Sequence, residues 1–138
     1  MPELFDILQD LAGTAELELR PDGGWIEIPE LDVVEMALRM TKAGSLLSTV
    51  TAVERADGET DLIYHYRRGS SALNVKTCTR GGRAASIATA CPAANWIERE
   101  IYDLYAVPFD GHPNPERLVR PPELPAGFFR RSQRSQTP

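Results

Sequence analysis

Acidic, basic and aromatic side chains crowd into one short stretch of the chain, residues 94–113. The chemically capable side chains in it are Trp96, Glu98, Arg99, Glu100, Tyr102, Asp103, Phe109 and His112. A carboxylate near a histidine is a pair that acid–base catalysis uses. Arginine and tryptophan are residues that anchor protein interfaces. The composition of this stretch therefore indicates one of two uses, proton transfer or binding.

The spacing of the apolar residues predicts a helix over residues 95–105. Ile97, Ile101 and the pair Leu104-Tyr105 recur at intervals of three and four residues, which places them on one helix face. The opposite face then carries Arg99, Glu100, Tyr102 and Asp103. The pattern predicts an amphipathic helix with an exposed polar face.

The ends of this helix carry recognisable local patterns. Asn95 and Glu98 fit a capping box, in which each side chain bonds the backbone N–H of the other residue. If the helix ends at Ala106 in a left-handed conformation, alanine costs about 1 kcal/mol there. His112 follows a glycine and precedes a proline, so we expect it to pin a turn. His65, within an alternating strand pattern, is expected to be a sheet residue rather than a ligand.

Binding explains the polar helix face better than catalysis does. An exposed pair such as Arg99 with Asp103 stabilises a helix by only about 0.3–0.5 kcal/mol, so stability alone does not account for the cluster. The catalytic alternative is a small hydrolase or isomerase with Glu98 or Glu100 and His112 as acid and base. Against it, no serine or cysteine nucleophile lies in a recognisable setting and no glycine-rich phosphate loop is present.

The residues from 98 onwards also follow a long spaced pattern. Glu98-Arg99-Glu100 is followed by Asp103 after two positions, by two large apolar residues, by His112 after six more, and by Leu118-Val119. This order resembles the signature of the C subunit of NADH:quinone oxidoreductase, the smaller hydrophilic subunit of respiratory complex I. It also resembles the homologous small subunit of energy-converting nickel–iron hydrogenases.

Two positions depart from the family pattern. Ala106 stands where the family usually has glycine, and Glu116 occupies a usually basic position, with Arg117 one step later. The resemblance is strong over residues 92–119 and loose upstream.

The resemblance implies a non-catalytic subunit of the peripheral arm that docks on the large quinone-site subunit, beside a cluster-bearing subunit. A hydrogenase or formate hydrogenlyase complex is the alternative parent. The chain itself would bind no cofactor, whereas the parent complex would use NADH or hydrogen, iron–sulfur clusters and quinone. The partner-binding residues would be Trp96, Glu98, Arg99, Glu100, Tyr102, Asp103, Phe109, His112 and Arg117.

Charge and composition exclude several classes of protein. The net charge is −5, and residues 1–35 hold ten acidic residues against Arg20 alone. Nucleic-acid binding rests mainly on clustered Lys and Arg, so the acidic body does not fit it. No apolar run approaches the ~20 residues of a membrane-spanning helix, and the N-terminus lacks a signal-peptide pattern. We therefore expect a cytoplasmic protein without direct membrane insertion, held at the inner face of the cell membrane through its complex.

The two cysteines, Cys78 and Cys91, form no Cys-x-x-Cys pair and have no nearby histidine. An iron–sulfur cluster or structural zinc normally needs four ligands, so the sequence predicts neither. A disulfide stays open, although free thiols are the rule in the cytosol.

Periodicity and turn residues predict a single α+β domain, with helices packed on one face of a mainly antiparallel sheet. The expected helices cover residues 2–12, 30–43 and 95–105, and the expected strands cover 15–20, 25–28, 46–54, 61–67 and 71–79. The first helix has one apolar stripe of Leu4, Ile7, Leu8 and Leu11, and Gly44 is expected to end the second helix. The first two strands are expected to form a hairpin, and the last three to pair consecutively through short turns at Asp57-Gly58 and Gly69-Ser70. The domain is expected to occupy residues 1–119. Residues 120–138, rich in proline and arginine, are expected to form an extended or disordered basic tail.

Overall fold

The computed structural model describes residues 3–114 of the chain. The elements in chain order are α1 (Leu4–Ile7), α2 (Gln9–Ala12), β1 (Glu18–Arg20), β2 (Gly23–Glu27), α3 (Val33–Lys42), β3 (Leu46–Glu54), β4 (Thr60–Arg68), β5 (Ser71–Cys78), β6 (Ala84–Ala85), α4 (Ala94–Tyr105) and β7 (Phe109–Asp110). The predicted basic tail, residues 120–138, lies outside the described residues.

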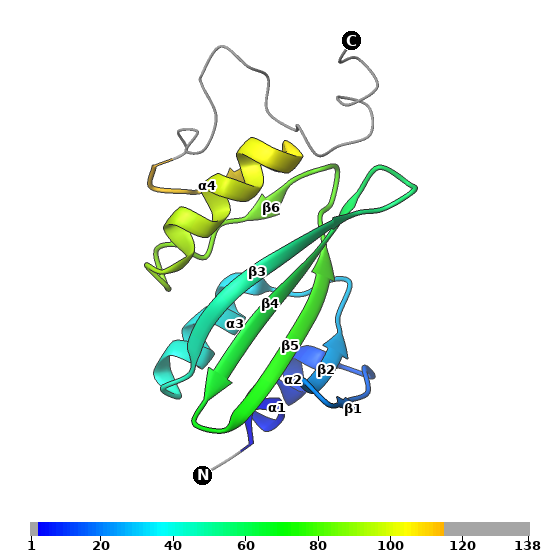
Figure 1. Cartoon of the computed structure of the whole chain (residues 1–138), viewed down its shortest axis with the longest axis vertical. Coiled ribbons are helices and arrows are strands. Elements are labelled where there is room, and N and C mark those ends of the chain that lie inside the picture. The colour runs from blue at the N-terminus through cyan, green and yellow to red at the C-terminus, as the bar shows by residue number, and fades with distance from the viewer. Residues whose placement is uncertain (1–2, 115–138) are drawn as a thin grey trace.

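Five strands form one mixed sheet in the order β1-β2-β5-β4-β3 (Figure 1). The strands β3, β4 and β5 pair consecutively and antiparallel, as their short turns predict. The hairpin of β1 and β2 was also predicted. No pattern in the sequence indicates that β2 runs parallel to β5, where Ile26 pairs with Val75.

The central strand β4 shows why these residues form a sheet. Thr60, Leu62, Tyr64 and Tyr66 alternate as its buried residues. Side chains of successive strand residues point to opposite faces, so these four form one apolar row on the core side. His65 lies on the other face, where Thr51 and Asn74 hydrogen-bond its two ring nitrogens at 2.8 and 2.6 Å. The prediction that His65 is a sheet residue is therefore confirmed.

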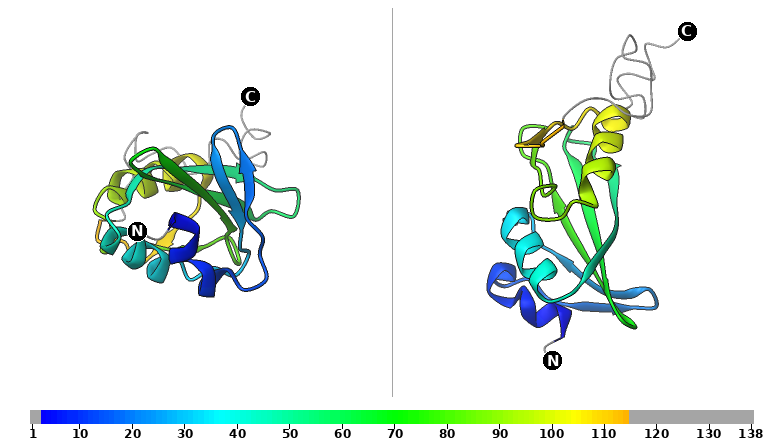
Figure 2. Two further views of the ribbon diagram at one scale, coloured as in Figure 1. Left: turned by 90° about the horizontal axis from the view of Figure 1, so that it is seen from below. Right: turned by 90° about the vertical axis from the view of Figure 1, so that its left-hand side faces the viewer.

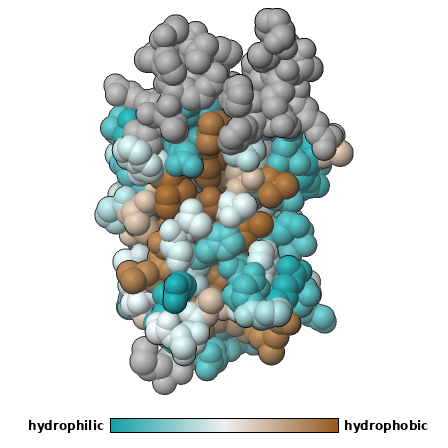
Figure 3. Space-filling model, in the orientation of Figure 1, coloured by the Kyte–Doolittle hydropathy of each residue, from teal (hydrophilic) through white to brown (hydrophobic). Residues whose placement is uncertain are grey.

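The helices α1, α2 and α3 lie on one face of the sheet, and α4 packs beside β3 at the other end (Figure 2). Asp32 caps α3 by accepting a hydrogen bond from the Glu35 backbone N–H at 3.1 Å. Gly44, with φ of 78°, follows the helix end as predicted. The sheet face away from these helices mixes hydrophilic and hydrophobic residues (Figure 3). This α+β arrangement agrees with the predicted fold class.

The predicted N-terminal helix, residues 2–12, is broken into α1 and α2. Leu8 between them has φ of −104° and ψ of 4°, and its N–H bonds the Phe5 carbonyl three residues back. This tighter turn keeps Leu4, Leu8 and Ala12 all buried against the core. A single helix was therefore the wrong prediction, although the apolar stripe was identified correctly.

Within residues 3–114, no helix is both long enough and apolar enough to cross a membrane.

Candidate functional site

Helix α4 positions most of the predicted site residues. It begins two residues earlier than the capping box requires, because the N-cap is Ala93 instead of Asn95, and no side chain caps it. The first turn is closed by backbone bonds from Ala94 to Cys91 and from Asn95 to Pro92. Glu98 lies beyond this first turn and points inward. The predicted capping box of Asn95 and Glu98 is therefore wrong.

Glu98 is a fully buried carboxylate, with none of its surface exposed. Its Oε1 accepts a hydrogen bond from the Ser86 hydroxyl at 2.6 Å, and its Oε2 accepts one from the Ile87 N–H at 2.8 Å. The sequence contained a signal for this inward position. Ala94, Glu98 and Ile101 recur at i, i+4 and i+7, so Glu98 occupies a place in the buried stripe of the helix.

The surroundings of Glu98 oppose its charge. Burial raises the pKa of the Glu98 carboxyl above its ordinary range, and the hydrogen bonds from Ser86 and Ile87 partly offset this. Burial, and then the charge of Glu98, raises the pKa of the Tyr64 hydroxyl on the neighbouring strand β4. Among residues 3–114, the buried hydroxyls of Tyr64 and Tyr66 have no hydrogen-bond partner. Glu98 therefore stands in a largely apolar interior with few polar groups to share its charge.

His112 is held in one tautomer. Its Nε2 lies 3.0 Å from the Asn95 carbonyl, which only accepts, so Nε2 carries a proton and donates. Its Nδ1 accepts from the Asn114 N–H at 2.9 Å. The same Nε2 is 3.7 Å from Oε1 of Glu98. Both ring nitrogens are thus engaged with the backbone, as expected for a histidine that pins a turn.

This geometry weighs against acid–base catalysis. A general base needs an accessible atom within hydrogen-bond reach of its substrate. Glu98 is enclosed and both of its oxygens accept hydrogen bonds, while His112 has no uncommitted nitrogen. The hydrolase alternative therefore finds no support in the arrangement of these two residues.

A surface hollow of about 280 Å³ lies over this buried pair. We call it the signature groove, and it is lined by Arg83, Glu98, Arg99, Tyr102, Pro108, Phe109, Asp110, Gly111 and His112. Five of these residues were predicted site residues: Glu98, Arg99, Tyr102, Phe109 and His112. The fold therefore brings the predicted cluster together around one depression.

The other predicted residues fall elsewhere. Trp96 projects from α4 with 60% of its surface exposed, and Glu100 is exposed as expected. Asp103 is fully buried, so the prediction that it lies on the exposed face is wrong. Arg117 lies outside the described residues.

Sequence reasoning missed Arg83 and Asp110, which form one wall of the groove. The guanidinium of Arg83 donates from Nε to Oδ1 of Asp110 at 3.0 Å. The two-stranded pairing of β6 with β7 brings these residues together from segments far apart in the chain. The hydrogen bond from Arg83, together with its positive charge, lowers the pKa of the Asp110 carboxyl. No local pattern around Arg83 signals this pair, because it depends on a long-range contact.

Ala106 ends α4 in the left-handed conformation, with φ of 56° and ψ of 37°. It is the sole non-glycine residue with positive φ between residues 3 and 114. The expected strain at this position is therefore present. Val107, which follows it, is fully buried, so the left-handed turn sends the chain back across the core toward the groove.

No group of three or more His, Cys, Asp or Glu side chains in the described part of the chain is arranged to hold a metal ion. Cys78 and Cys91 are both free thiols.

The sequence comparisons agree with this site. The sequence model of the family described as respiratory-chain NADH dehydrogenase, 30 Kd subunit, matches residues 26–135, which is most of the chain. The chain belongs to this family. The match includes the whole of α4 and every residue that lines the groove.

Three relatives named as NADH-quinone oxidoreductase subunits are 32–44% identical to this chain over the aligned residues. The chain is 34% identical over 93 residues to the C/D subunit of NADH-quinone oxidoreductase from Methylococcus capsulatus, covering 67% of this chain and 15% of that protein. It is 32% identical over 139 residues to the C/D subunit from Gluconacetobacter diazotrophicus, covering 86% of this chain and 23% of that protein. It is 44% identical over 62 residues to the C subunit from a Methylobacterium species, covering 43% of this chain and 29% of that protein. The chain therefore spans less than a third of the length of these relatives.

Proposed function

We propose that this chain is a non-catalytic subunit of the peripheral arm of an NADH:quinone oxidoreductase, and that it docks on the large quinone-site subunit through α4 and the signature groove. The cluster-bearing subunit beside the large one is a second expected neighbour. The chain would sit on the cytoplasmic side of the membrane, attached through its complex. In this role it supplies binding surface, while NADH oxidation, iron–sulfur clusters and quinone belong to other subunits.

The observation that carries the proposal is the contrast between the floor and the rim of the groove. The floor is rigid, because Glu98 and His112 are fixed by hydrogen bonds to Ser86, Ile87, Asn95 and Asn114. The rim presents Arg99 and Tyr102 half-buried, with Trp96 exposed on the same helix. Tryptophan, tyrosine and arginine are enriched among residues that dominate binding energy. A preordered hollow with such a rim fits a docking surface better than a reaction site.

The relatives add support for the choice of partner. Two of them are named as C/D subunits, and this chain corresponds to 15% and 23% of their length. We infer that the remainder of those proteins contains the large subunit joined to the C-like part.

Charge reversal at the rim tests this proposal. We expect Arg99→Glu to abolish co-purification with a tagged large subunit, because it replaces an arginine anchor with a like charge against acidic partner groups. The matched control is Arg67→Glu, which reverses an exposed arginine on β4 outside the groove. The melting temperature of the free chain should change little in either variant.

A second variant separates binding from folding. Trp96→Ala removes an exposed ring and should weaken the complex about 30-fold if Trp96 is a hot spot. Loss of folding in Arg99→Glu together with full binding by Trp96→Ala would contradict the proposed interface. Native purification decides the parent complex, since recovery of a hydrogenase large subunit instead would replace the NADH:quinone oxidoreductase assignment.

A further inference from the structure

We propose that Glu59 positions the groove from outside it, by clamping the segment of residues 79–87 whose Arg83 forms one wall. The consequence for docking rests on the proposed function, whereas the clamp itself does not. Glu59 lies at the end of the turn between β3 and β4, well away from α4 in the sequence. Neither the signature pattern nor the groove includes it.

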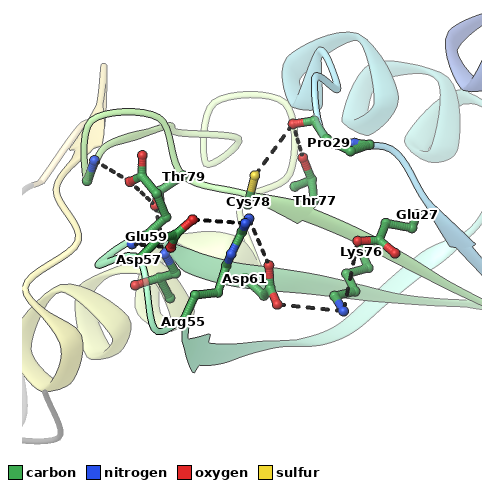
Figure 4. A network of polar contacts seen from close by, with 12 residues as sticks. Glu27, Pro29, Arg55, Asp57, Glu59, Asp61, Lys76, Thr77, Cys78 and Thr79 are labelled. Carbon is green, nitrogen blue, oxygen red and sulfur yellow. Dashed lines mark hydrogen bonds and ion pairs between the residues drawn. The ribbon is translucent and has the colours of Figure 1, made fainter. Parts of the chain in front are cut away.

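The carboxylate of Glu59 is held by three donors from one short segment (Figure 4). Its Oε2 accepts from the Gly81 N–H at 2.8 Å, and its Oε1 accepts from the Gly82 N–H at 2.7 Å. The Thr79 hydroxyl donates to Oε1 at 2.9 Å. Two successive backbone N–H groups converging on one anion form a nest, which normally binds a carboxylate or phosphate. In this protein the nest is filled by a side chain of the same chain.

The two glycines make the nest because of their backbone angles. Gly81 and Gly82 have φ of 59° and 77°, which an L-residue rarely adopts. They are the two central residues of a tight turn, in which Arg80 and Arg83 exchange backbone hydrogen bonds of 2.9 and 3.1 Å. A Cβ at either glycine would meet no atom within 4 Å. The requirement is therefore for the turn conformation and not for space, and Glu59 stabilises that conformation.

Arg83 is the last residue of this turn, and it also lines the groove. Its side chain pairs with Asp110, and the backbone continues as β6, which pairs with β7. The Ser86 N–H then bonds the Asp110 carbonyl at 2.8 Å, and the Ser86 hydroxyl reaches Glu98. One continuous set of contacts thus leads from Glu59 to the wall and floor of the groove. If the turn loosens, Arg83 loses the register that sets it opposite Asp110.

Amide hydrogen exchange on the full chain tests the clamp without any partner. Glu59→Gln removes the charge and leaves only one acceptor oxygen, so exchange at Gly81 and Gly82 should accelerate about tenfold or more. Glu27→Gln is the control, because it makes the same change on an exposed residue of β2. The melting temperature should stay close to wild type in both. Unchanged exchange in the segment 79–87 of Glu59→Gln would overturn the proposal.

Binding to the tagged large subunit tests the consequence. We expect Glu59→Gln to weaken binding about tenfold at an unchanged melting temperature. In the background of Arg83→Ala the same change should have no further effect, because Glu59 acts through Arg83. Faster exchange with unchanged affinity, or full additivity of the two substitutions, would overturn the positioning role. Failure of the wild-type chain to bind the large subunit would instead overturn the proposed function, and hydrogen exchange would still decide the clamp.

Discussion

Glu59 and Glu98 hold two parts of the segment that joins β5 to α4: Glu59 binds its start at residues 79–82, and the buried Glu98 binds its middle at residues 86–87. Glu59 accepts two backbone N–H groups and a hydroxyl, which lower the pKa of its carboxyl because they favour the charged form. Glu98 accepts one N–H and one hydroxyl, but burial raises the pKa of its carboxyl. Similar hydrogen bonds therefore have opposite electrostatic outcomes in the two places.

The difference separates local order from global stability. The Gly81 and Gly82 N–H groups belong to an exposed and a half-buried residue and can turn to water when the carboxylate is removed, so its loss should loosen one turn. Of the donors to Glu98, the Ile87 N–H is buried and Ser86 is half-buried, and an unpaired polar group in the interior costs free energy. The two glutamates therefore fix the same segment, but Glu98 is expected to have the larger effect on the stability of the whole fold.

The largest expected effect is that of Glu98→Ala. This change leaves the Ser86 hydroxyl and the Ile87 N–H without their acceptor and opens a space beneath α4, so the free energy of unfolding should fall by about 3 kcal/mol. Urea denaturation followed by circular dichroism measures it. Glu100→Ala is the matched control on the exposed side of the same helix and should change stability by less than about 0.5 kcal/mol. Equal effects of the two substitutions would show that burial does not distinguish Glu98.

The pH dependence of stability should distinguish the two glutamates by sign. The folded-state pKa of Glu98 lies above its ordinary value of 4.5, so the folded protein binds more protons between these values and stability falls as pH rises through that window. The contribution of Glu59 is present above 4.5 and is lost as pH falls through its lowered folded-state pKa.

Urea unfolding of each variant over a pH series measures these slopes. Glu98→Gln should remove part of the loss of stability that occurs as pH rises above 4.5. Glu59→Gln should remove part of the loss of stability that occurs as pH falls below 4.5. Changes of the same sign in both variants would contradict the contrast between the two sites.

A smaller effect is expected at Ala106, which lies between α4 and the strand β7. Ala106→Gly relieves the left-handed strain, and the unfolding free energy should rise by about 0.5–1 kcal/mol. Ala43→Gly is the control, because Ala43 ends α3 with φ of −79° and gains nothing from glycine. Thermal unfolding of both variants gives the comparison, and destabilisation of both would mean that the strain at Ala106 is negligible.

The smallest effect on stability is expected at the groove wall. Arg83 and Asp110 pair across side chains that are 57% and 54% exposed, so solvent screens them and their coupling free energy should be far smaller than the effect of Glu98→Ala. A double-mutant cycle with Arg83→Ala and Asp110→Ala measures this coupling. A coupling free energy as large as the effect of Glu98→Ala would contradict this prediction and would show that the pair stabilises the whole fold.

Local patterns predicted the parts of this molecule that local chemistry determines. Short turns at Asp57-Gly58 and Gly69-Ser70 indicated the three consecutive strands in order. Apolar spacing predicted α4 to within one residue, and the left-handed end of that helix fell on Ala106. Each of these features depends on residues that are neighbours in the sequence.

The features that the sequence did not reveal depend on distant contacts. Glu98 is bound by residues 86–87, and Arg83 is bound by Asp110. Local sequence patterns span only a few residues, so they indicate neither contact. The inward position of Glu98 was readable from its spacing with Ala94 and Ile101. It was missed because glutamate is seldom fully buried and a capping box explained it more simply.

The parallel contact between β2 and β5 has a consequence for how the chain folds. Ile26 pairs with Val75, and the Asn74 amide donates to the Gly24 carbonyl at 3.2 Å. The partners of β2 therefore lie about fifty positions further along the chain. The strands β3, β4 and β5 need only their own short turns to assemble. Contacts between distant residues form slowly because a long loop must close first. We therefore expect the N-terminal hairpin to emerge during synthesis with β2 unpaired on one side, and to complete the sheet only after the other three strands have assembled.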